Sequence, residues 1–534
     1  MGPHIALNLA ELIRYQMFAG PDRPALTLEG AGVRPDEVRT YGTMWSSGQR
    51  LARALLALGI KPGERFGVLM ANHVEFADIM MAAVITGTVF VPVDPRTRAD
   101  KLAFMLGLPG CVGVIAADYA LPNLQPVRAQ IASLRWVVGL ETDEGKVPLS
   151  AYPDVVSYAA MLQSPAPDLP IAAADPDGPM QLIFTSGTTG DPKGIVMTHR
   201  RFCETSIVAL NLAGHAADDR LYTGLSMTHA NAQVISFGPA LSAGLHTVMS
   251  RRFTKSRLWD ITRKYQCTTF NLLGGMSTAI YAEPPRPDDA DNPVRHVISA
   301  GMPAAIWENF ERRFGVKILE FYGAAEGGLT AKPFGQGPIG SIGKPSPKYK
   351  YRIVDEEGRE VPKGTPGELL MRAADDAPFK VEYFGNPEAS AKKCRGGWLH
   401  MGDVVREDEN GWLFFESRIG GGIRRNGEFI NPGVVEKAIA ESGLVDDVFV
   451  YGIGAASGAP GDKDVVAAVV PKNPAAFAAK DLFLVCRASL DANLVPTYLQ
   501  VVEQIPKTAS EKPQERFLIE AFEADRCSVF TDAA

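Results

Sequence analysis

The chain has 534 residues, of which 46% are hydrophobic and 22% are charged, and its net charge is −7. This length exceeds what one hydrophobic core normally holds, so we expect a globular protein with at least two domains. The acidic balance argues against a nucleic-acid partner, and no apolar run approaches the roughly 20 residues of a membrane span.

The N-terminus and the cysteines bear on the compartment. The opening residues, Met1-Gly-Pro-His-Ile5, lack the basic and apolar regions of a signal peptide. The six cysteines are scattered and show no Cys-x-x-Cys spacing. Such spacing is typical of reduced thiols, not of a disulfide or zinc framework. We therefore expect a cytoplasmic protein without a membrane span.

The first 140 residues alternate helical and strand patterns. Apolar residues recur at helical spacing over 43–58 and 74–85, and short apolar runs at 66–70, 89–93 and 112–115 predict strands. Strands separated by helices of about a dozen residues indicate βαβ units and a parallel sheet.

The same alternation resumes in the middle of the chain. The sequence predicts strands at 245–249, 268–273, 294–299 and 316–321 and helices at 256–265 and 304–314. The Pro- and Asp-rich stretch 283–293 is expected to be a surface loop, and the Gly/Pro-rich stretch 335–347 a connection.

The last third of the chain changes character twice. From Tyr351 the pattern shortens to strands and turns, which predicts a small β-rich unit with a hairpin turn at Asp408–Gly411. After the glycine run 420–422, the sequence predicts helices at 433–442, 478–490 and beyond Lys512, and strands at 448–451 and 465–470. We place a domain boundary there, with a large domain at 1–417 and a small one at 418–534.

Hydroxyl residues and glycines follow the apolar run Met180–Phe184. The stretch contains Thr185, Ser186, Gly187, Thr188, Thr189, Gly190 and Lys193. Glycines let backbone N–H groups approach a ligand, while the hydroxyls add donors and the lysine adds a positive charge. The pattern predicts a cradle for a polyphosphate, the alternative being a polar turn without a ligand. It is not the P-loop, in which Gly-Lys-Ser/Thr opens a helix.

Two more stretches carry groups that suit a nucleotide. Tyr322 and Glu326 follow a predicted strand, and ligands of open α/β sheets bind beyond the carboxyl ends of strands. There Tyr322 can stack on a base and Glu326 can hold Mg²⁺ between phosphates. Asp403, directly after Gly402, can accept both ribose hydroxyls. Each stretch alone is also compatible with an ordinary turn.

These stretches resemble the motifs of the adenylate-forming superfamily, which includes acyl-CoA synthetases, aryl-CoA ligases, luciferases and peptide-synthetase adenylation domains. The resemblance covers essentially the whole chain, with five motifs in superfamily order. It implies an α/β fold: a large N-terminal domain of mostly parallel sheets flanked by helices, with a small β-rich unit, and a small mobile α+β C-terminal domain. The small domain is expected to rotate between two half-reactions.

The resemblance also implies roles for individual residues. Its catalytic positions are Thr185, His229, Glu326 and Lys512, with Glu326 as the metal ligand. Its ATP-binding positions are Thr185, Ser186, Gly187, Thr188, Thr189, Gly190, Lys193, Gly301, Met302, Tyr322, Gly323, Ala325, Asp403, Arg418 and Lys512. Without the resemblance, His229 could equally be a core or surface histidine, and Lys512 a solvated lysine.

This chain departs from the superfamily pattern at three positions. Ala325 stands where threonine is usual, and Glu511 stands where a glycine usually precedes the catalytic lysine. Gly420 stands at the hinge, where a charged residue is usual. In the segment that follows the hinge, the implied CoA-binding residues are Arg424, Arg425, Gly427 and Glu428, and the alternative for the two arginines is a solvated basic turn.

The acyl group is expected to meet a pocket with polar and apolar parts. Its implied lining is His229, Asn231, Gln233, Val234, Asn271, Gly274, Gly275, Gly301 and Ala324, with Phe237 and Met276 as an apolar wall. The stretch Phe270–Met276 looks closest to the carnitine/crotonobetaine-CoA ligase-like branch. Amino-acid adenylation domains usually carry an Asp near the start of this segment, and none stands between Tyr222 and Leu241.

The implied function is that of an ATP-dependent carboxylic acid–CoA ligase acting on an aromatic or otherwise bulky acid. It would use ATP, Mg²⁺ and coenzyme A. Two alternatives stay open: an acyl- or aryl-adenylate-forming enzyme that loads a carrier protein, and a nucleotide-binding sensor without turnover. A homodimer is also left open.

Overall fold

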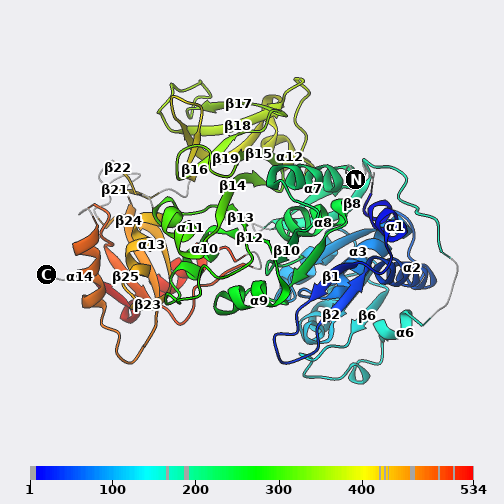
Figure 1. Cartoon of the computed structure of the whole chain (residues 1–534). Coiled ribbons are helices and arrows are strands. Elements are labelled where there is room, and N and C mark those ends of the chain that lie inside the picture. The colour runs from blue at the N-terminus through cyan, green and yellow to red at the C-terminus, as the bar shows by residue number, and fades with distance from the viewer. Residues whose placement is uncertain are drawn as a thin grey trace. The chain divides into compact units, whose positions relative to one another are not determined.

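The computed structural model describes residues 8–163, 168–185, 192–419, 423–425, 428–430, 432–456, 463–490, 493–508 and 511–532. The chain forms two compact units, coloured along the chain in Figure 1. Unit 1 comprises Met1–Thr254, Asp260–Asn271 and Val381–Lys392, and unit 2 comprises Lys255–Trp259, Leu272–Lys380 and Lys393–Ala534.

Unit 1 contains a seven-stranded sheet of order β7-β6-β5-β3-β4-β8-β9. Its strands are β3 (Arg65–Leu69), β4 (Val89–Val93), β5 (Gly113–Ala117), β6 (Trp136–Leu140), β7 (Val155–Ser157), β8 (Pro179–Thr185) and β9 (Lys193–Thr198). All neighbours pair in parallel except β8 and β9, which are antiparallel. The predicted parallel sheet is confirmed.

Strand β4 shows why helices cover both faces of this sheet. Val89, Val91 and Val93 pack in one buried cluster with Leu102 of α4 (Ala99–Gly107). Phe90 meets Phe76 of α3 (Val74–Thr86) edge-on, with ring centroids 6.4 Å apart. Successive side chains of a strand point to opposite faces, so an all-apolar strand requires a helix on each side.

The remainder of unit 1 is a second group of strands with its helices. The strands, in spatial order, are β12 (Thr269–Leu273), β10 (Arg220–Thr223), β11 (His246–Met249), β1 (Pro24–Leu28) and β2 (Glu37–Thr40). The helices of this part and of its connections are α1 (Leu9–Ala19), α2 (Tyr41–Ala57), α5 (Leu121–Leu124), α6 (Tyr158–Met161), α7 (His199–Ala213), the π-helix η4 (Ala232–Phe237), α8 (Gly238–Ala243), α9 (Leu258–Tyr265) and α12 (Pro387–Lys393). Only β1 and β2 pair antiparallel here.

Unit 2 begins with a mostly antiparallel arrangement of order β17-β18-β19-β20-β16-β15-β14-β13. Its strands are β13 (His296–Ala300), β14 (Lys317–Ala324), β15 (Gly327–Lys332), β16 (Ser341–Pro345), β17 (Tyr349–Val354), β18 (Gly367–Ala373), β19 (Leu399–Glu407) and β20 (Leu413–Arg418), with helices α10 (Gly274–Tyr281) and α11 (Trp307–Phe314). The β-rich unit predicted from Tyr351 is confirmed, and so is the turn at Asp408–Gly411, where the Gly411 N–H donates to the Asp408 carbonyl.

The prediction that 335–347 is only a connection was wrong, because β16 lies within it. Gly343 has φ +94°, and a Cβ there would lie 2.0 Å from the Ala331 carbonyl carbon. The glycine that reads as a loop signal is what lets β16 approach β15 this closely.

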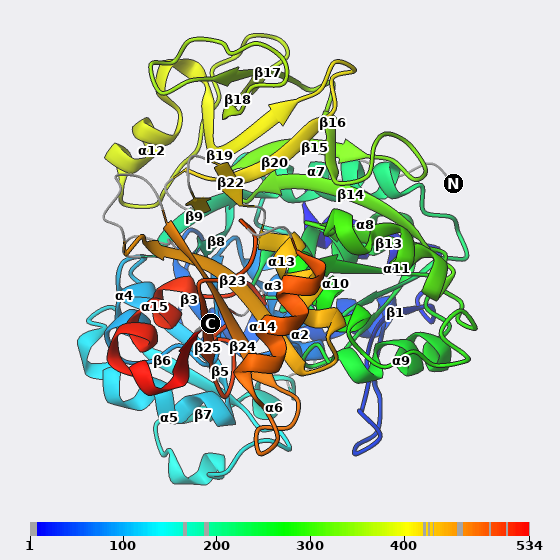
Figure 2. The ribbon, with the colours of Figure 1, turned by 90° about the vertical axis from the view of Figure 1, so that its left-hand side faces the viewer.

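A second sheet of unit 2, ordered β23-β24-β25-β26, lies near the C-terminal end. The elements of this part are β21 (Ile423–Arg425), β22 (Glu428–Ile430), α13 (Pro432–Glu441), β23 (Val445–Gly454), β24 (Lys463–Pro471), α14 (Ala479–Ser489), β25 (Tyr498–Val501), α15 (Glu515–Ala524) and β26 (Val529–Thr531). The alternate residues of β24 belong to two different cores. Val465 packs with α13 and α14, whereas Val466 packs with Leu518 of α15. Figure 2 shows α15 on one side of this sheet and α13 and α14 on the other.

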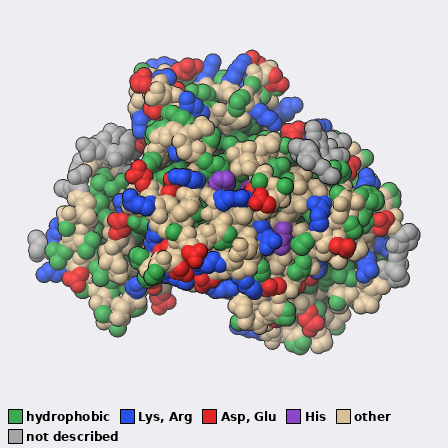
Figure 3. Space-filling view, viewed as in Figure 1, with side chains coloured by type: hydrophobic (Ala, Val, Ile, Leu, Met, Phe, Trp, Pro, Cys, Tyr) green, Lys and Arg blue, Asp and Glu red, His purple; other side chains and the backbone are tan. Residues whose placement is uncertain are grey.

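The α/β fold class predicted from the sequence is confirmed, while the boundary at 418 stays a prediction. Within the residues that the structure describes, no helix combines the length and apolar character needed to cross a membrane. Acidic and basic side chains are interspersed on the face shown in Figure 3.

Candidate functional site

Asp403 is the centre of a polar cluster in unit 2. The antiparallel register of β19 and β20 places Asp403 opposite Arg418, and the Arg418 Nε lies 3.5 Å from the Asp403 Oδ1. From β14, the Tyr322 hydroxyl donates to the Asp403 Oδ2 at 2.5 Å. Asp403 is buried, so two neighbours from two different strands hold its carboxylate in place.

The electrostatics of this cluster show which group carries the proton. Desolvation raises the pKa of Asp403, while the Tyr322 hydrogen bond, Arg418, Lys393 and Lys512 act against that rise. Burial and then the charge of Asp403 raise the pKa of Tyr322 well above its usual range. Tyr322 is therefore the donor and Asp403 the acceptor. A carboxylate has about four lone-pair sites, so each Asp403 oxygen keeps capacity for a ribose hydroxyl.

Lys512 lies in a tight loop between Ile505 and α15. Its N–H donates to the Thr508 Oγ1 at 3.2 Å, and its carbonyl accepts the Thr508 N–H at 2.8 Å. Glu511, in the usual glycine position, has φ +58°, a left-handed conformation that favours glycine. The substitution noted in the sequence thus introduces local backbone strain of about 1 kcal/mol or more directly before the lysine.

The charge of Lys512 is coupled to the Asp403 cluster. Its pKa is lowered, first by desolvation and then by the positive charge of Arg418, while Asp403 and Glu326 act in the opposite direction. The side chain still keeps an exposed surface, so water screens part of this field. Tyr322, Glu326, Asp403, Arg418 and Lys512, predicted from separate motifs, thus belong to one electrostatic cluster.

Glu326 lies where β14 turns back into β15. The predicted strand 316–321 continues to Ala324, because β14 pairs antiparallel with β15 up to the contact of Ala324 with Gly327. Gly323 and Ala324 thus end the strand, and Ala325 and Glu326 form the turn. A Mg²⁺ ion at a phosphate site is held by one or two carboxylates plus substrate oxygens, and Glu326 fits that role.

Protein ligands alone do not form a metal site in the part of the chain that the structure describes. No group of three or more His, Cys, Asp or Glu side chains there could hold a metal ion.

Glu320 is a polar residue that the sequence analysis missed. Its Oε1 and Oε2 accept the N–H groups of Gly301 and Met302 at 2.5 and 3.1 Å, and the side chain is buried. Burial raises its pKa to about 8, against the two backbone hydrogen bonds. The acidic residue within the predicted strand 316–321 is the sequence feature that could have indicated this role of Glu320. Glu320 fixes the turn that carries two predicted ATP-binding residues.

In unit 1, the predicted phosphate loop joins β8 to β9. Thr185 ends β8 opposite Lys193, which begins β9, and the Thr185 hydroxyl lies 3.5 Å from the Lys193 carbonyl. The Lys193 Nζ lies 5.4 Å from the centre of the Tyr383 ring. The hairpin brings both ends of the loop together. Ser186, Gly187, Thr188, Thr189 and Gly190 lie outside the described residues.

The predicted acyl-facing segment follows β10 and leads into a π-helix. His229 is partly buried, and its N–H donates to the Ser226 carbonyl at 3.1 Å. Gln233 is fully buried: its Nε2 donates to the Met227 carbonyl at 2.8 Å and to the Gln181 Oε1 at 3.1 Å. The Gln181 Nε2 donates in return to the Gln233 Oε1 at 2.7 Å. Single-turn π-helices occur frequently at functional sites.

The remaining acyl predictions divide between the two units. In unit 1, the Asn271 Nδ2 donates to the Asn231 Oδ1 at 2.6 Å, and Val234 is buried. In unit 2, Gly274 begins α10 and Gly275 follows it.

The predicted CoA segment is only partly described. The Arg425 Nη1 donates to the carbonyls of Val495 and Asn493 at 2.7 and 3.3 Å. This arginine therefore connects β21 to the segment that precedes β25. Gly427 and the hinge residue Gly420 lie outside the described residues, as do the side chains of Arg424 and Glu428.

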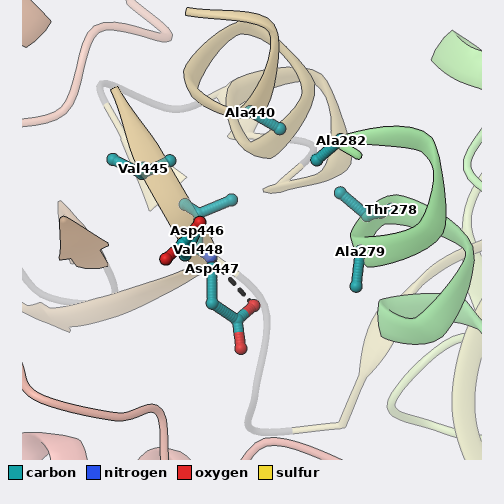
Figure 4. Close-up of a pocket in the computed structure, with 8 residues that line it drawn as sticks. All are labelled: Thr278, Ala279, Ala282, Ala440, Val445, Asp446, Asp447 and Val448. Carbon is teal, nitrogen blue, oxygen red and sulfur yellow. Dashed lines mark hydrogen bonds between the residues drawn. The ribbon is translucent and has the colours of Figure 1, made fainter. Parts of the chain in front are cut away.

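A small pocket in unit 2 lies apart from the predicted residues. Figure 4 shows it between the end of α10 and the start of β23, lined mainly by small side chains such as Ala279, Ala282 and Ala440. Beside it, the Lys507 Nζ lies 2.5 Å from the Asp447 Oδ2. The pocket has room for about one water molecule and does not hold a substrate.

Comparisons with known proteins identify the family of the chain. Residues 13–375 match the AMP-binding enzyme family, and residues 434–512 match the AMP-binding enzyme C-terminal domain. The chain is 27% identical over 474 residues to a crotonobetaine/carnitine–CoA ligase of Escherichia coli, covering 87% of this chain and 89% of that protein.

Solved structures show the same fold. An anthranilate CoA ligase in complex with anthranoyl-AMP superposes with a TM-score of 0.83 at 22% identity, covering 98% of this chain and 99% of that one. The o-succinylbenzoate CoA synthetase of Bacillus subtilis, in complex with ATP and magnesium, gives 0.75 at 21% identity, covering 95% and 99%. The chain therefore belongs to the AMP-binding enzyme family, the adenylate-forming superfamily that includes the AMP-forming acyl-CoA ligases.

Proposed function

We propose that this protein is an ATP-dependent carboxylic acid–CoA ligase. In the first half-reaction a carboxylate oxygen attacks the α-phosphorus of ATP, forming an acyl-adenylate and releasing pyrophosphate. In the second, the CoA thiolate attacks the acyl carbon, forming the thioester and releasing AMP. The geometry at Asp403 carries the proposal: the Tyr322 hydroxyl donates to this carboxylate and the Arg418 Nε lies 3.5 Å from it. The charges of Asp403 and Glu326 also act on Lys512, which supports a common role for these residues.

Each member of the cluster has a separate part in the first half-reaction. Asp403, held by Tyr322 and Arg418, binds the ribose hydroxyls, and the Tyr322 ring stacks on the base. Lys512 stabilises negative charge that develops around the α-phosphorus, as preorganised cations do in phosphoryl-transfer sites. Glu326 supplies the protein ligand of Mg²⁺, which neutralises phosphate charge when bound.

The phosphate loop has its own role in this proposal. The loop between Thr185 and Lys193 holds the β- and γ-phosphates. Glu320 accepts the N–H groups of Gly301 and Met302, so it holds the turn through which these two residues bind the nucleotide. For the second half-reaction we propose that the small domain turns about Gly420, carrying Lys512 away and bringing Arg424, Arg425, Gly427 and Glu428 to CoA.

The proposed acid is aromatic or otherwise bulky. Val234 and Phe237 on the π-helix are buried apolar side chains beside the amides of the same segment. One similar protein is named for crotonobetaine and carnitine, and another is named for anthranilate, an aromatic acid. The oligomeric state stays open.

One assay tests the proposal against its alternatives. Pyrophosphate release is measured over a panel of carboxylic acids, with and without CoA and Mg²⁺. The proposal predicts acid-dependent release and formation of a thioester and AMP when CoA is present. Pyrophosphate release that leaves an acyl-adenylate with which CoA does not react would indicate a carrier-loading enzyme. Nucleotide binding without pyrophosphate release would indicate a sensor.

A further inference from the structure

We infer that Asn271 accepts a hydrogen bond from the acyl group, so that the substrate is a carboxylic acid bearing a hydroxyl or an aromatic amino group on its acyl part. This inference rests on the proposed function and adds a substrate class to it. The observation that carries it is a buried amide oxygen of Asn271 for which the described residues provide no hydrogen-bond partner.

Of the two polar atoms of the Asn271 side chain, only the nitrogen has a hydrogen-bond partner among the described residues. Asn271 belongs to β12 and is only 2% exposed, and its Nδ2 donates to the Asn231 Oδ1 at 2.6 Å. The Asn271 Oδ1 is buried and accepts nothing from the described residues. Leaving a buried acceptor unpaired is unfavourable, so native proteins satisfy most such atoms with protein, water or ligand.

A neighbouring pair of amides has partners for both of its side-chain oxygens. Gln181 and Gln233 exchange hydrogen bonds in both directions, and Gln233 also donates to the Met227 carbonyl. Both oxygens of that pair are occupied. The same π-helix region thus contains one closed amide pair and one that keeps an acceptor open.

The position of the open oxygen fits a substrate site. β12 pairs in parallel with β10, and the chain leaves β10 at Thr223 toward His229 and Asn231. Asn271 is the middle residue of β12, and the pairing of Tyr222 with Phe270 puts it level with Thr223, the last residue of β10. Ligands of open α/β sheets bind at the carboxyl ends of the strands. Asn231 follows by two residues the histidine that is predicted to lie beside the acyl carboxylate.

The chemistry of an amide oxygen limits the ligand class. It is a neutral acceptor, so it pairs with O–H or N–H donors without the full negative charge that an ammonium group favours. No Asp or Glu stands between Tyr222 and Leu241 to supply that charge. The open group therefore selects a hydroxyl or an aromatic amine over an α-ammonium group or a methyl group.

Isosteric acids test the inference directly. Aminobenzoates are compared with methylbenzoates at each ring position, and 3-hydroxybutyrate with 3-methylbutyrate, by kcat/KM for pyrophosphate release. We expect one donor-bearing acid to exceed its methyl isostere by about tenfold or more, since a buried polar group discriminates strongly against a partner that cannot pair with it.

Variants assign that preference to Asn271. Asn271→Leu should reduce the preference to about onefold, and Asn271→Asp, which keeps an acceptor oxygen, should retain it. Asn211→Leu, at an exposed amide on α7, serves as the matched control and should change nothing. ATP binding and the thermal midpoint are measured for each variant, so that a misfolded Asn271→Leu is recognised and Asn271→Asp then decides.

The possible outcomes separate the inference from the proposed function. Methyl isosteres that react as well as every donor-bearing acid, or an Asn271→Leu enzyme that keeps the preference, would overturn the inference and assign the oxygen to a bound water. A preference for acids with only an acceptor, such as a methoxy group, would overturn it too. If no acid releases pyrophosphate at all, the proposed function fails first and the inference fails with it.

Discussion

Around Asp403 the polar side chains carry full charges, whereas around Gln233 they are neutral amides. In unit 2, the charges of Arg418 and Lys512 act on the pKa of Asp403, and those of Arg418, Asp403 and Glu326 act on the pKa of Lys512. In unit 1, amides contact amides, and one oxygen remains open. Charge suits phosphate chemistry, because it stabilises charge that develops in the reaction. Neutral groups suit discrimination between acids, because an unpaired partner is rejected. The two regions thus differ in the task that each is suited to perform.

Lys512→Ala should produce the largest effect in the charged region. We expect adenylate formation to fall about 10²–10³-fold, the scale of removing one preorganised contact to developing charge, while supplied acyl-AMP and CoA still give thioester. Because the lysine pKa is lowered, adenylation by the parent should also decline at a lower pH than an ordinary lysine would dictate. Single-turnover measurements of each half-reaction check both points.

A control in the same region uses Lys507, whose ammonium pairs with Asp447 instead. Lys507→Ala should keep normal adenylation. Equal losses of both half-reactions in Lys512→Ala would contradict the assignment of this lysine to adenylation alone.

Asp403→Asn should have the second-largest effect. Replacing the carboxylate with an amide removes charged hydrogen bonds, so the KM for ATP should rise about 10–100-fold with a smaller change in kcat. Glu416→Gln is the matched control, because it breaks the Arg406–Glu416 pair of the same two strands, with Nε and Oε1 3.2 Å apart. An unchanged ATP dependence in Asp403→Asn would place this acid outside the nucleotide site.

Variants of the closed Gln181–Gln233 pair should change the stability of the protein and not its charge. Gln181→Leu or Gln233→Leu alone leaves a buried partner unpaired, which we expect to reduce the free energy of unfolding by about 1–3 kcal/mol. The double variant should cost less than the sum of the two, since both partners then lack polar groups. Denaturant unfolding of all four proteins of this cycle measures the coupling, and strictly additive losses would show that the contact contributes nothing.

Glu320 should give the smallest effect, a change in pH dependence. Its pKa is raised from 4.5 to about 8 in the folded protein. Between these values the folded state keeps a proton that the unfolded state has lost, so stability falls as the pH rises through this window. In Glu320→Gln, which cannot titrate, the fall should be shallower. Thermal midpoints at pH 5, 6, 7 and 8 compare the two proteins, and identical slopes would contradict the raised pKa.

The sequence predicted best what repeats along the chain or follows a motif. The apolar runs at 89–93 and 465–470 predicted strands because both faces of each are buried. Tyr322 and Asp403, predicted from separate stretches to bind the nucleotide, form a direct hydrogen bond.

What the sequence could not predict depends on contacts between distant segments. Strand β16 exists because Gly343 allows close pairing with β15, although a glycine reads locally as a loop. The role of Glu320 depends on a turn about 20 residues away in the chain, and the difference between the Asn and Gln pairs appears only when their partners are known. The hinge at Gly420 stays a prediction.

The comparison between the two regions is tested most directly by one set of rate measurements. For an acid that bears a hydrogen-bond donor and its methyl isostere, kcat/KM is measured in the parent, in Lys512→Ala and in Asn271→Leu. We predict that Lys512→Ala slows both acids by the same factor and preserves the ratio of their kcat/KM values, whereas Asn271→Leu removes the preference for the donor-bearing acid. A Lys512→Ala enzyme with an altered ratio, or an Asn271→Leu enzyme that slows both acids equally, would contradict the division between charge and selectivity.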